Sequence, residues 1–169
     1  YKDVYWSRFK NMYYPGDYAI RDSDGYFWLL GRADDILKIA GHRIGTAELE
    51  STLMTHNDVA EAAVCAIPDE IKGEAIVAFI VLKHGVKMNN DKLQLELVQT
   101  VRDGIGPIAT PQQIYFVTKL PKTRSGKIMR RLLRSIASND NIGDISTLED
   151  SDAVQEVKSA FDDQQNIIR

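Results

Sequence analysis

The stretch from Leu120 to Arg134 combines residue types that could carry out chemistry on an anion. Its sequence, LPKTRSGKIMRRLLR, is a basic loop followed by a helical pattern. Pro121 and Gly126 favour a loop, and glycine lets one backbone segment approach another closely. Lys127 follows this glycine, and its ammonium group is a compact, mobile charge with three donors. Such a group suits an anionic transition state better than a core, although an isolated pattern of this kind also fits a solvated turn.

Three further charged residues stand beside glycines or turns. Asp17 and Arg32 each directly follow a glycine, and Arg43 lies two residues after Gly41. Loop residues held by a scaffold often face ligands. Taken singly each signal is weak, because a turn aspartate is usually a solvated cap and such an arginine usually lies on a surface loop.

The composition limits the classes of protein. The chain has 169 residues, 44% of them hydrophobic and 27% charged, so it is globular. Its net charge of −3 argues against a general nucleic-acid partner. No apolar run reaches the roughly 18 residues needed to span a bilayer, so no membrane association is expected. Cys65, the single cysteine, predicts no disulfide and fits a reducing compartment: the cytoplasm, nucleus or mitochondrial matrix.

Hydrophobic periodicity predicts an α+β fold with a short β-sheet flanked by helices. Leu49, Leu53 and Met54 are expected to form the buried stripe of a helix that Thr46 caps. Residue 90 is expected to cap the next helix. The other expected elements are strands over 18–21, 26–30, 59–67, 75–82 and 114–117, an apolar alternation over 36–39, and the helix after Lys127.

The order of these elements predicts three parts. Residues 1–33 hold many aromatic side chains and a small hairpin, and are expected to be the end of a larger domain that precedes them. Residues 34–138 form a domain of ordinary size. Residues 139–169 are acidic and polar and are expected to be a tail with a weak helix over 154–161. The start at Tyr1, without methionine, favours a fragment of a longer chain.

Taken together and in this order, the motifs resemble the C-terminal part of the AMP-forming acyl-CoA synthetases, which are adenylate-forming enzymes. Within that family the sequence of these motifs most resembles the acetyl-CoA synthetases. The resemblance runs from about Tyr5 to Leu148. It rests on GHRIGTAELE, IGPIATP, PKTRSGKIMRRLLR and GDISTL.

The resemblance implies a reaction in two steps. ATP and acetate give an acetyl-adenylate and pyrophosphate, and coenzyme A then gives acetyl-CoA and AMP, with Mg²⁺ accompanying the nucleotide. The fold it implies is a small mobile C-terminal lid domain, preceded by the last hairpin of the large N-terminal domain. That domain would carry the phosphate loop and the acyl pocket, so this chain alone is expected to be inactive.

The resemblance also assigns the residues of the adenylation step. Lys127 matches the catalytic lysine, which stabilises charge on the oxygens in flight. Asp17 matches the carboxylate that binds the ribose hydroxyls, Arg32 matches an arginine that holds the nucleotide, and Arg43 one that contacts its phosphate in the second step.

Further residues are implied for the thioester step. Asp34 matches the hinge about which the lid rotates. Gly41 matches the glycine lining the pantetheine tunnel, and Ala40 stands where that site often has serine. Arg102 matches an arginine that binds the coenzyme A nucleotide.

Met54, His56 and Val59 match a stretch where some members of the family bind a cation. A plain helix end explains the same residues equally well. His42 is read as a residue that hydrogen-bonds within its turn.

Two alternatives to an acetate-specific enzyme stay open. One is another acyl- or aryl-CoA ligase or an adenylation domain, because the acyl pocket lies outside this chain. The other is a non-catalytic module that binds coenzyme A or a nucleotide. The resemblance finally implies that Lys127 is an acetylation site, which would make a protein acetyltransferase and a deacetylase its partners.

Overall fold

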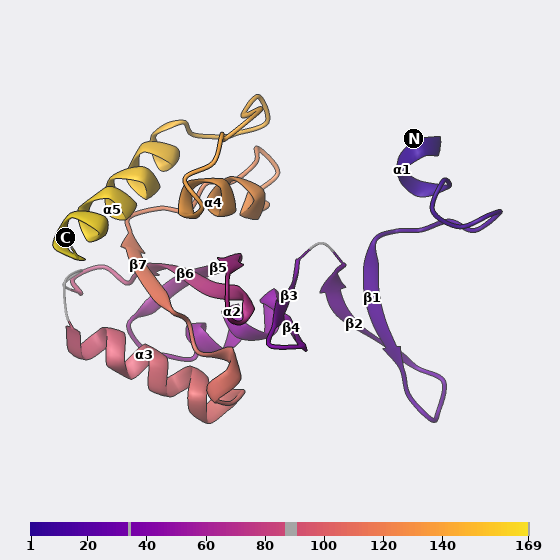
Figure 1. Cartoon of the computed structure of the whole chain (residues 1–169), viewed down its shortest axis with the longest axis horizontal. Helices are drawn as coiled ribbons and strands as arrows, with labels where there is room; N and C mark the ends of the chain where they lie inside the picture. Colours follow the sequence, from indigo (N-terminus) through magenta and orange to yellow (C-terminus); the bar gives the residue numbers. More distant parts are fainter. Residues whose placement is uncertain (34, 87–90, 169) are drawn as a thin grey trace.

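A three-stranded sheet forms the centre of the molecule (Figure 1). The computed structural model describes residues 1–33, 35–86 and 91–168. Strand β5 (Val59–Asp69) pairs antiparallel with β6 (Gly73–Leu82), and β6 pairs parallel with β7 (Gln113–Val117). The prediction that the two long apolar runs are neighbouring strands is therefore confirmed.

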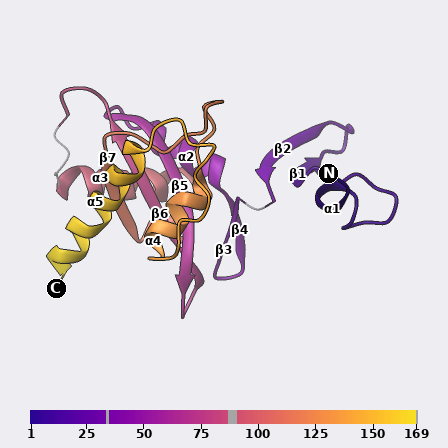
Figure 2. The same ribbon diagram turned by 90° about the horizontal axis from the view of Figure 1, so that it is seen from above.

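Helices cover both faces of this sheet (Figures 1 and 2). Alternate residues of β6 point to opposite faces, as the pleat requires. Ile76 and Ile80 pack with α2 (Thr46–Met54) and α3 (Asp91–Gly104). Val77 and Phe79 pack with α4 (Arg130–Ala137) and α5 (Asp152–Ile168). The mixed fold with a small sheet between helices agrees with the predicted α+β class.

A second hairpin packs on the same face of the sheet as α2 and α3. Strands β3 (Ile36–Ile39) and β4 (His42–Gly45) pair antiparallel, with Ile39 opposite His42. Leu37, Ile39 and Ile44 are buried in the same cluster as α2 and α3. This hairpin is therefore fixed to the body by its own core residues.

Helix α2 departs from the sequence prediction at both ends. Gly45 is the N-cap, no side chain caps the helix, and Thr46 is its buried first residue. Leu49 and Leu53 are fully buried, whereas Met54 is 49% exposed. Met54 follows Leu53 directly and so points about 100° around the helix from it. The predictions that Thr46 caps the helix and that Met54 belongs to its buried stripe were therefore wrong.

Helix α3 has the buried face that its periodicity predicted. Leu93, Leu97 and Val101 are at most 1% exposed. Residue 90, the expected cap, lies outside the described residues. A short 3₁₀ turn, η1 (Pro107–Ala109), follows the helix and leads to β7.

Helix α5 is longer than predicted, and it packs against the body. Val154, Val157 and Phe161 are buried against the second face of the sheet. The Phe161 ring lies 5.7 Å from that of Tyr115 on β7. The polar composition of this segment concealed a narrow apolar stripe, which suffices to dock one helix face.

The N-terminal residues form a separate hairpin with a short helix, α1 (Lys2–Tyr5). Strand β1 (Asp17–Arg21) pairs antiparallel with β2 (Phe27–Arg32). Their turn is stabilised by Asp22, whose carboxylate accepts hydrogen bonds from two backbone N–H groups and from Trp28 Nε1. Large apolar side chains of this hairpin are exposed, namely Ile20, Tyr26, Phe27, Trp28 and Leu29. Such a patch is typical of a surface that another element covers.

Cys65 is buried in the core between the sheet and helices α4 and α5, and this burial raises the pKa of its thiol to about 12.

The described part of the chain contains no helix with the length and apolarity that a membrane crossing needs.

Replacing Val157 with alanine tests whether α5 belongs to the folded body. Val157 is fully buried, so Val157→Ala should lower the free energy of unfolding by about 2 kcal/mol. Gln155→Ala, at an exposed position of the same helix, should change it by less than about 0.5 kcal/mol. Urea denaturation of the purified chain measures both, and equal stability of the two variants would show that the helix is not docked.

Candidate functional site

Lys127 lies at the end of a tight loop between β7 and α4. The Thr123 hydroxyl accepts a hydrogen bond from the Lys127 backbone N–H at 3.1 Å, and Thr123 N–H donates to the Lys127 carbonyl at 2.9 Å. Gly126 has φ +80°, a conformation that glycine adopts without strain. The Lys127 side chain is exposed, and within the described residues its ammonium group has no hydrogen-bond or ion-pair partner. The loop therefore presents a free cation.

The base of this loop is anchored to the body. Lys122 pairs with Ile128 and Thr123 with Leu148 through isolated β-bridges. The Lys122 ammonium lies 2.7 Å from the Glu61 carboxylate. These contacts restrict the backbone on both sides of Lys127, while its side chain is exposed to solvent.

An ion-pair network beside the loop was missed by the sequence analysis. Arg130 donates to both oxygens of Glu50, with Nε–Oε1 at 2.9 Å and NH2–Oε2 at 2.6 Å. Its NH1 group lies 3.2 Å from Asp35 Oδ2. Glu50 is 8% exposed and also accepts the backbone N–H of Val64 at 3.0 Å. The network joins α4, α2, β5 and the residue before β3.

The two carboxylates stabilise the charged form of Arg130. Burial lowers the pKa of Arg130, but the hydrogen bonds and charge of Glu50 and the charge of Asp35 outweigh it, so the pKa lies above its usual value. A glutamate directly after the buried Leu49 was the available sequence signal, because a carboxylate so close to a core needs a partner. Its partner is 80 positions away in the chain, so periodicity could not identify it.

A basic hollow of about 460 Å³ brings Arg32 and Arg43 together. Arg43 lies against Tyr18, with its guanidinium carbon 5.8 Å from the ring centroid and NH1 3.5 Å from the hydroxyl. The hollow is lined by Arg8, Tyr14, Gly16, Tyr18, Arg32, Ala33, Ile36, Lys38 and Arg43. Four cationic side chains around one concave surface favour an anionic ligand.

Asp17 lies beside this hollow. It is exposed and stands opposite Arg32 in the register of β1 and β2. The preceding Gly16 has φ +80°, and its carbonyl accepts the Ala33 N–H at 2.6 Å. The structure therefore places three of the expected nucleotide residues in one neighbourhood.

The turn between β3 and β4 contains Ala40 and Gly41. Their φ values are +47° and +85°, as in the two-residue turns that match the twist of a hairpin. Apart from the two adjoining residues of the turn, no atom of the described residues lies within 4 Å of the place that a Cβ of residue 41 would occupy. Within this chain the backbone conformation, and not crowding, therefore requires glycine. His42 is exposed on the first position of β4.

Among the described residues, no hydrogen bond or ion pair joins Arg102 to this turn. Arg102 is exposed in the last turn of α3. Asp34, the expected hinge, lies outside the described residues, whereas its neighbours Ala33 and Asp35 are described.

The expected cation residues lie at the end of α2. His56 accepts the Asp58 N–H at Nδ1 (3.3 Å), and its Nε2 lies 3.7 Å from Glu96. Both ring nitrogens therefore contact protein groups, and Met54 is exposed. Among the described residues, no group of three or more His, Cys, Asp or Glu could hold a metal ion. The site with Met54, His56 and Val59 stays a prediction that would rest on backbone carbonyls.

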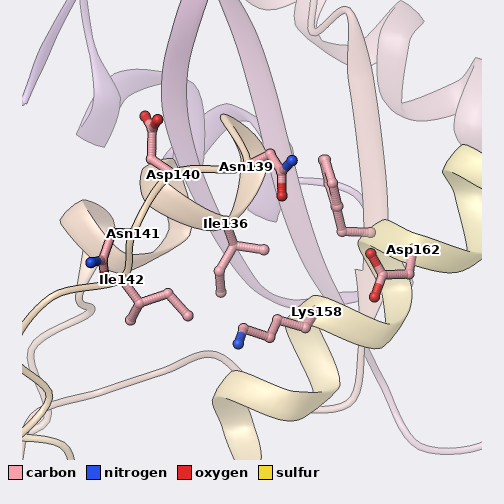
Figure 3. A pocket seen from close by; sticks show the side chains of 8 residues that line it. Ile136, Asn139, Asp140, Asn141, Ile142, Lys158 and Asp162 are labelled. Atoms are coloured by element: carbon pink, nitrogen blue, oxygen red, sulfur yellow. The ribbon is translucent and has the colours of Figure 1, made fainter.

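A second hollow, of about 410 Å³, lies between the end of α4 and α5 (Figure 3). The Asp140 carboxylate points away from Lys158, so the charged groups do not converge on one point. None of the expected site residues lines this hollow.

Comparison with known proteins identifies the family. Residues 48–127 match the family of the AMP-binding enzyme C-terminal domain. These residues belong to this family, and the resemblance read from the motifs is confirmed. A solved structure, the anthranilate CoA ligase AuaEII in complex with anthranoyl-AMP, is 40% identical with a TM-score of 0.65, over 72% of this chain and 23% of that chain.

Curated relatives narrow the similarity further. The chain is 60% identical to acetyl-coenzyme A synthetase of Pyrobaculum aerophilum over 96% of its length. It is 49% identical over 96% of its length to 3-hydroxypropionyl-coenzyme A synthetase of Metallosphaera sedula. In both cases it spans 24% of the relative, so most of each relative has no counterpart in this chain.

Exchanging side chains at the β3–β4 turn tests the conformational requirement at Gly41. Gly41→Ala should cost about 1 kcal/mol of folding free energy, because an L-residue is strained at this φ. Ala40→Gly relieves the same strain one residue earlier and should be neutral or stabilising by up to about 1 kcal/mol. Thermal and urea unfolding of the purified chain measures both changes, and similar losses in the two variants would contradict the assignment of strain.

Proposed function

We propose that this chain is the C-terminal part of an AMP-forming acetate–CoA ligase, which converts acetate, ATP and coenzyme A to acetyl-CoA, AMP and pyrophosphate. The observation that carries the proposal is the exposed ammonium group of Lys127 on an anchored loop, which has no partner among the described residues. Its support is the 60% identity to an acetyl-coenzyme A synthetase across nearly the whole chain.

In the first step, the acetate oxygen attacks the α-phosphorus of ATP, the bond to pyrophosphate breaks, and acetyl-AMP forms. Negative charge grows on the attacking and bridging oxygens. Lys127 stabilises that charge and aligns the two reactants. Because the backbone of the loop is anchored, less conformational entropy is lost when the Lys127 side chain is positioned for the reaction.

The basic hollow suits the nucleotide. Asp17 would accept hydrogen bonds from both ribose hydroxyls, as a carboxylate with two oxygens can. Arg32 would hold the nucleotide, and Arg43, on the same hollow, would contact its phosphate in the second step. Guanidinium groups are well suited to phosphate oxygens because of their forked donors.

We propose the same division of the chain as the sequence predicts. Residues 1–33 end the large AMP-binding domain, residues 34–138 form the lid, and residues 139–169 complete its C-terminal side. The lid turns about Asp34 after adenylation, so that Lys127 leaves and the turn with Ala40 and Gly41 approaches. Coenzyme A then attacks the acetyl carbon through its sulfur, and AMP leaves. Arg102 would bind the nucleotide part of coenzyme A.

The partner implied by this proposal is the remainder of the same polypeptide. The exposed apolar side chains of β1 and β2 are suited to the large domain as their cover. Mg²⁺ would accompany ATP, but the described residues offer no metal-binding cluster, so we assign no step to it. A reducing compartment is consistent with the buried free thiol of Cys65.

A related acyl substrate is the second candidate. The Metallosphaera sedula relative bears the name of a 3-hydroxypropionyl enzyme and matches this chain at 49% identity. The lid is therefore compatible with more than one acyl group. Substrate profiling of the full-length enzyme decides between acetate and larger acids.

We also propose that Lys127 is reversibly acetylated by protein acetyltransferase and deacetylase partners. Its side chain is exposed, and acetylation removes the charge that adenylation needs. Lys127→Gln should imitate the acetylated enzyme.

Removing the ammonium group tests the proposal directly. In the full-length enzyme, Lys127→Ala should slow acetate-dependent ATP–pyrophosphate exchange by about 10²–10³-fold, the usual effect of losing one preorganised contact. Thioester formation from supplied acetyl-AMP and coenzyme A should persist, because Lys127 has left the site by then.

Arg124→Ala is the matched control. It removes a charge of the same sign from the same exposed loop and should leave both partial reactions within about threefold of wild type. Undiminished exchange in Lys127→Ala would refute the catalytic assignment, and the loss of neither step would favour a binding module.

The 169-residue chain by itself should be inactive. Adenylation needs phosphate and acyl contacts that these residues do not supply. Incubation of the purified chain with ATP, acetate and labelled pyrophosphate should therefore produce no labelled ATP. Exchange above the level of a Lys127→Ala chain would contradict this prediction.

A further inference from the structure

Arg130 stands three positions after Lys127, yet the surroundings of the two side chains differ. Lys127 is exposed, whereas the Arg130 side chain is only 24% exposed and is engaged with two carboxylates. It begins α4 directly after the loop. The loop that presents Lys127 therefore ends at Arg130, whose side chain is ion-paired with the packed body.

Each of the three guanidinium nitrogens makes a contact. Nε and NH2 bind the two oxygens of Glu50, and NH1 binds Asp35. A planar fork can make these contacts at once, whereas the ammonium of lysine is a point charge that cannot reproduce them. The geometry is therefore specific for arginine and not only for positive charge.

The contacts link the Lys127 loop to the segment that carries Arg32. The Asp35 carboxylate accepts from Arg130, and the Asp35 N–H donates to the Arg32 carbonyl at 3.1 Å. Arg32 in turn lines the basic hollow. One continuous path of hydrogen bonds thus runs from the start of α4 to the hollow expected to bind nucleotide.

We propose that Arg130 is a positioning residue for Lys127, which sets the orientation of the loop within the lid by clamping α4 to Glu50 and Asp35. This inference rests on the proposed function. Arg130 acts through Lys127 and contacts no reacting atom. Since only adenylation uses Lys127, weakening the clamp slows adenylation and spares the thioester step.

The neighbouring Arg131 offers a matched control. Its guanidinium donates to the carbonyls of Ile142, at 3.0 Å, and Asp144, at 2.6 Å, and contacts no carboxylate in the described structure. Arg131→Lys therefore makes the same chemical change one residue along the same helix, away from the clamp.

The test compares Arg130→Lys and Arg131→Lys in the full-length enzyme. Arg130→Lys should lower kcat for acetate-dependent pyrophosphate exchange by about tenfold or more, with the KM for ATP changed by less than about threefold. Formation of acetyl-CoA from supplied acetyl-AMP should stay within about threefold of wild type. Arg131→Lys should leave both reactions within the same limit.

Asp35→Asn is the second variant, and it leaves the Glu50 pair in place if Arg130→Lys folds poorly. It should slow exchange by about threefold or more and should be less than additive with Arg130→Lys, because both changes weaken one clamp. Equal losses in both partial reactions, together with a lower Tm, would reduce Arg130 to a structural residue and overturn the inference. Unchanged exchange in both variants would also overturn it.

The outcome for Lys127→Ala separates this inference from the proposed function. If Lys127→Ala abolishes exchange while Arg130→Lys and Asp35→Asn do not slow it, only the positioning role fails. If Lys127→Ala leaves exchange intact, the catalytic assignment fails, and with it the inference.

Discussion

The buried carboxylate of Glu50 is the constraint on which the arrangement of the helices around the sheet depends. It is 8% exposed and binds both the Val64 N–H and the guanidinium of Arg130. Removing one partner of such a pair typically costs about 3–5 kcal/mol, because the other charge is left buried and uncompensated. Helix α2, strand β5 and the start of α4 therefore have one stable mutual arrangement.

The sheet beside this network is packed on both faces and supports the loops around it. Both of its faces are covered, so β6 is apolar on each side, with Val77, Ala78, Phe79 and Ile80 all fully buried. The residues with proposed chemistry lie at the edges of this packed body. Lys127 is on a loop anchored at both ends, and Gly41 is in a two-residue turn between paired strands. In the lid rotation proposed above, such a body would carry each of these tips as a unit.

The elements predicted from the sequence were those with strong local signals. The long apolar runs of β5 and β6 and the periodic face of α3 were identified because burial on a regular element repeats at a fixed spacing. The predictions failed where local signals compete or are weak. Thr46 resembled a cap, but Gly45 serves as the N-cap, and α5 appeared polar although Val154, Val157 and Phe161 dock it on the sheet.

The sequence by itself determined the family, the order of the main strands and helices, and the prediction of Lys127 as the reactive cation. These depend on residue types and short spacings, which are written along the chain. Only the tertiary structure decided that Arg32 and Arg43 share one hollow, that the Lys127 side chain is exposed, and that Arg130 reaches Glu50 across 80 positions. The physical reason is that ion pairs and concave surfaces depend on distances in space, and these exist only after the sheet and its helices have packed.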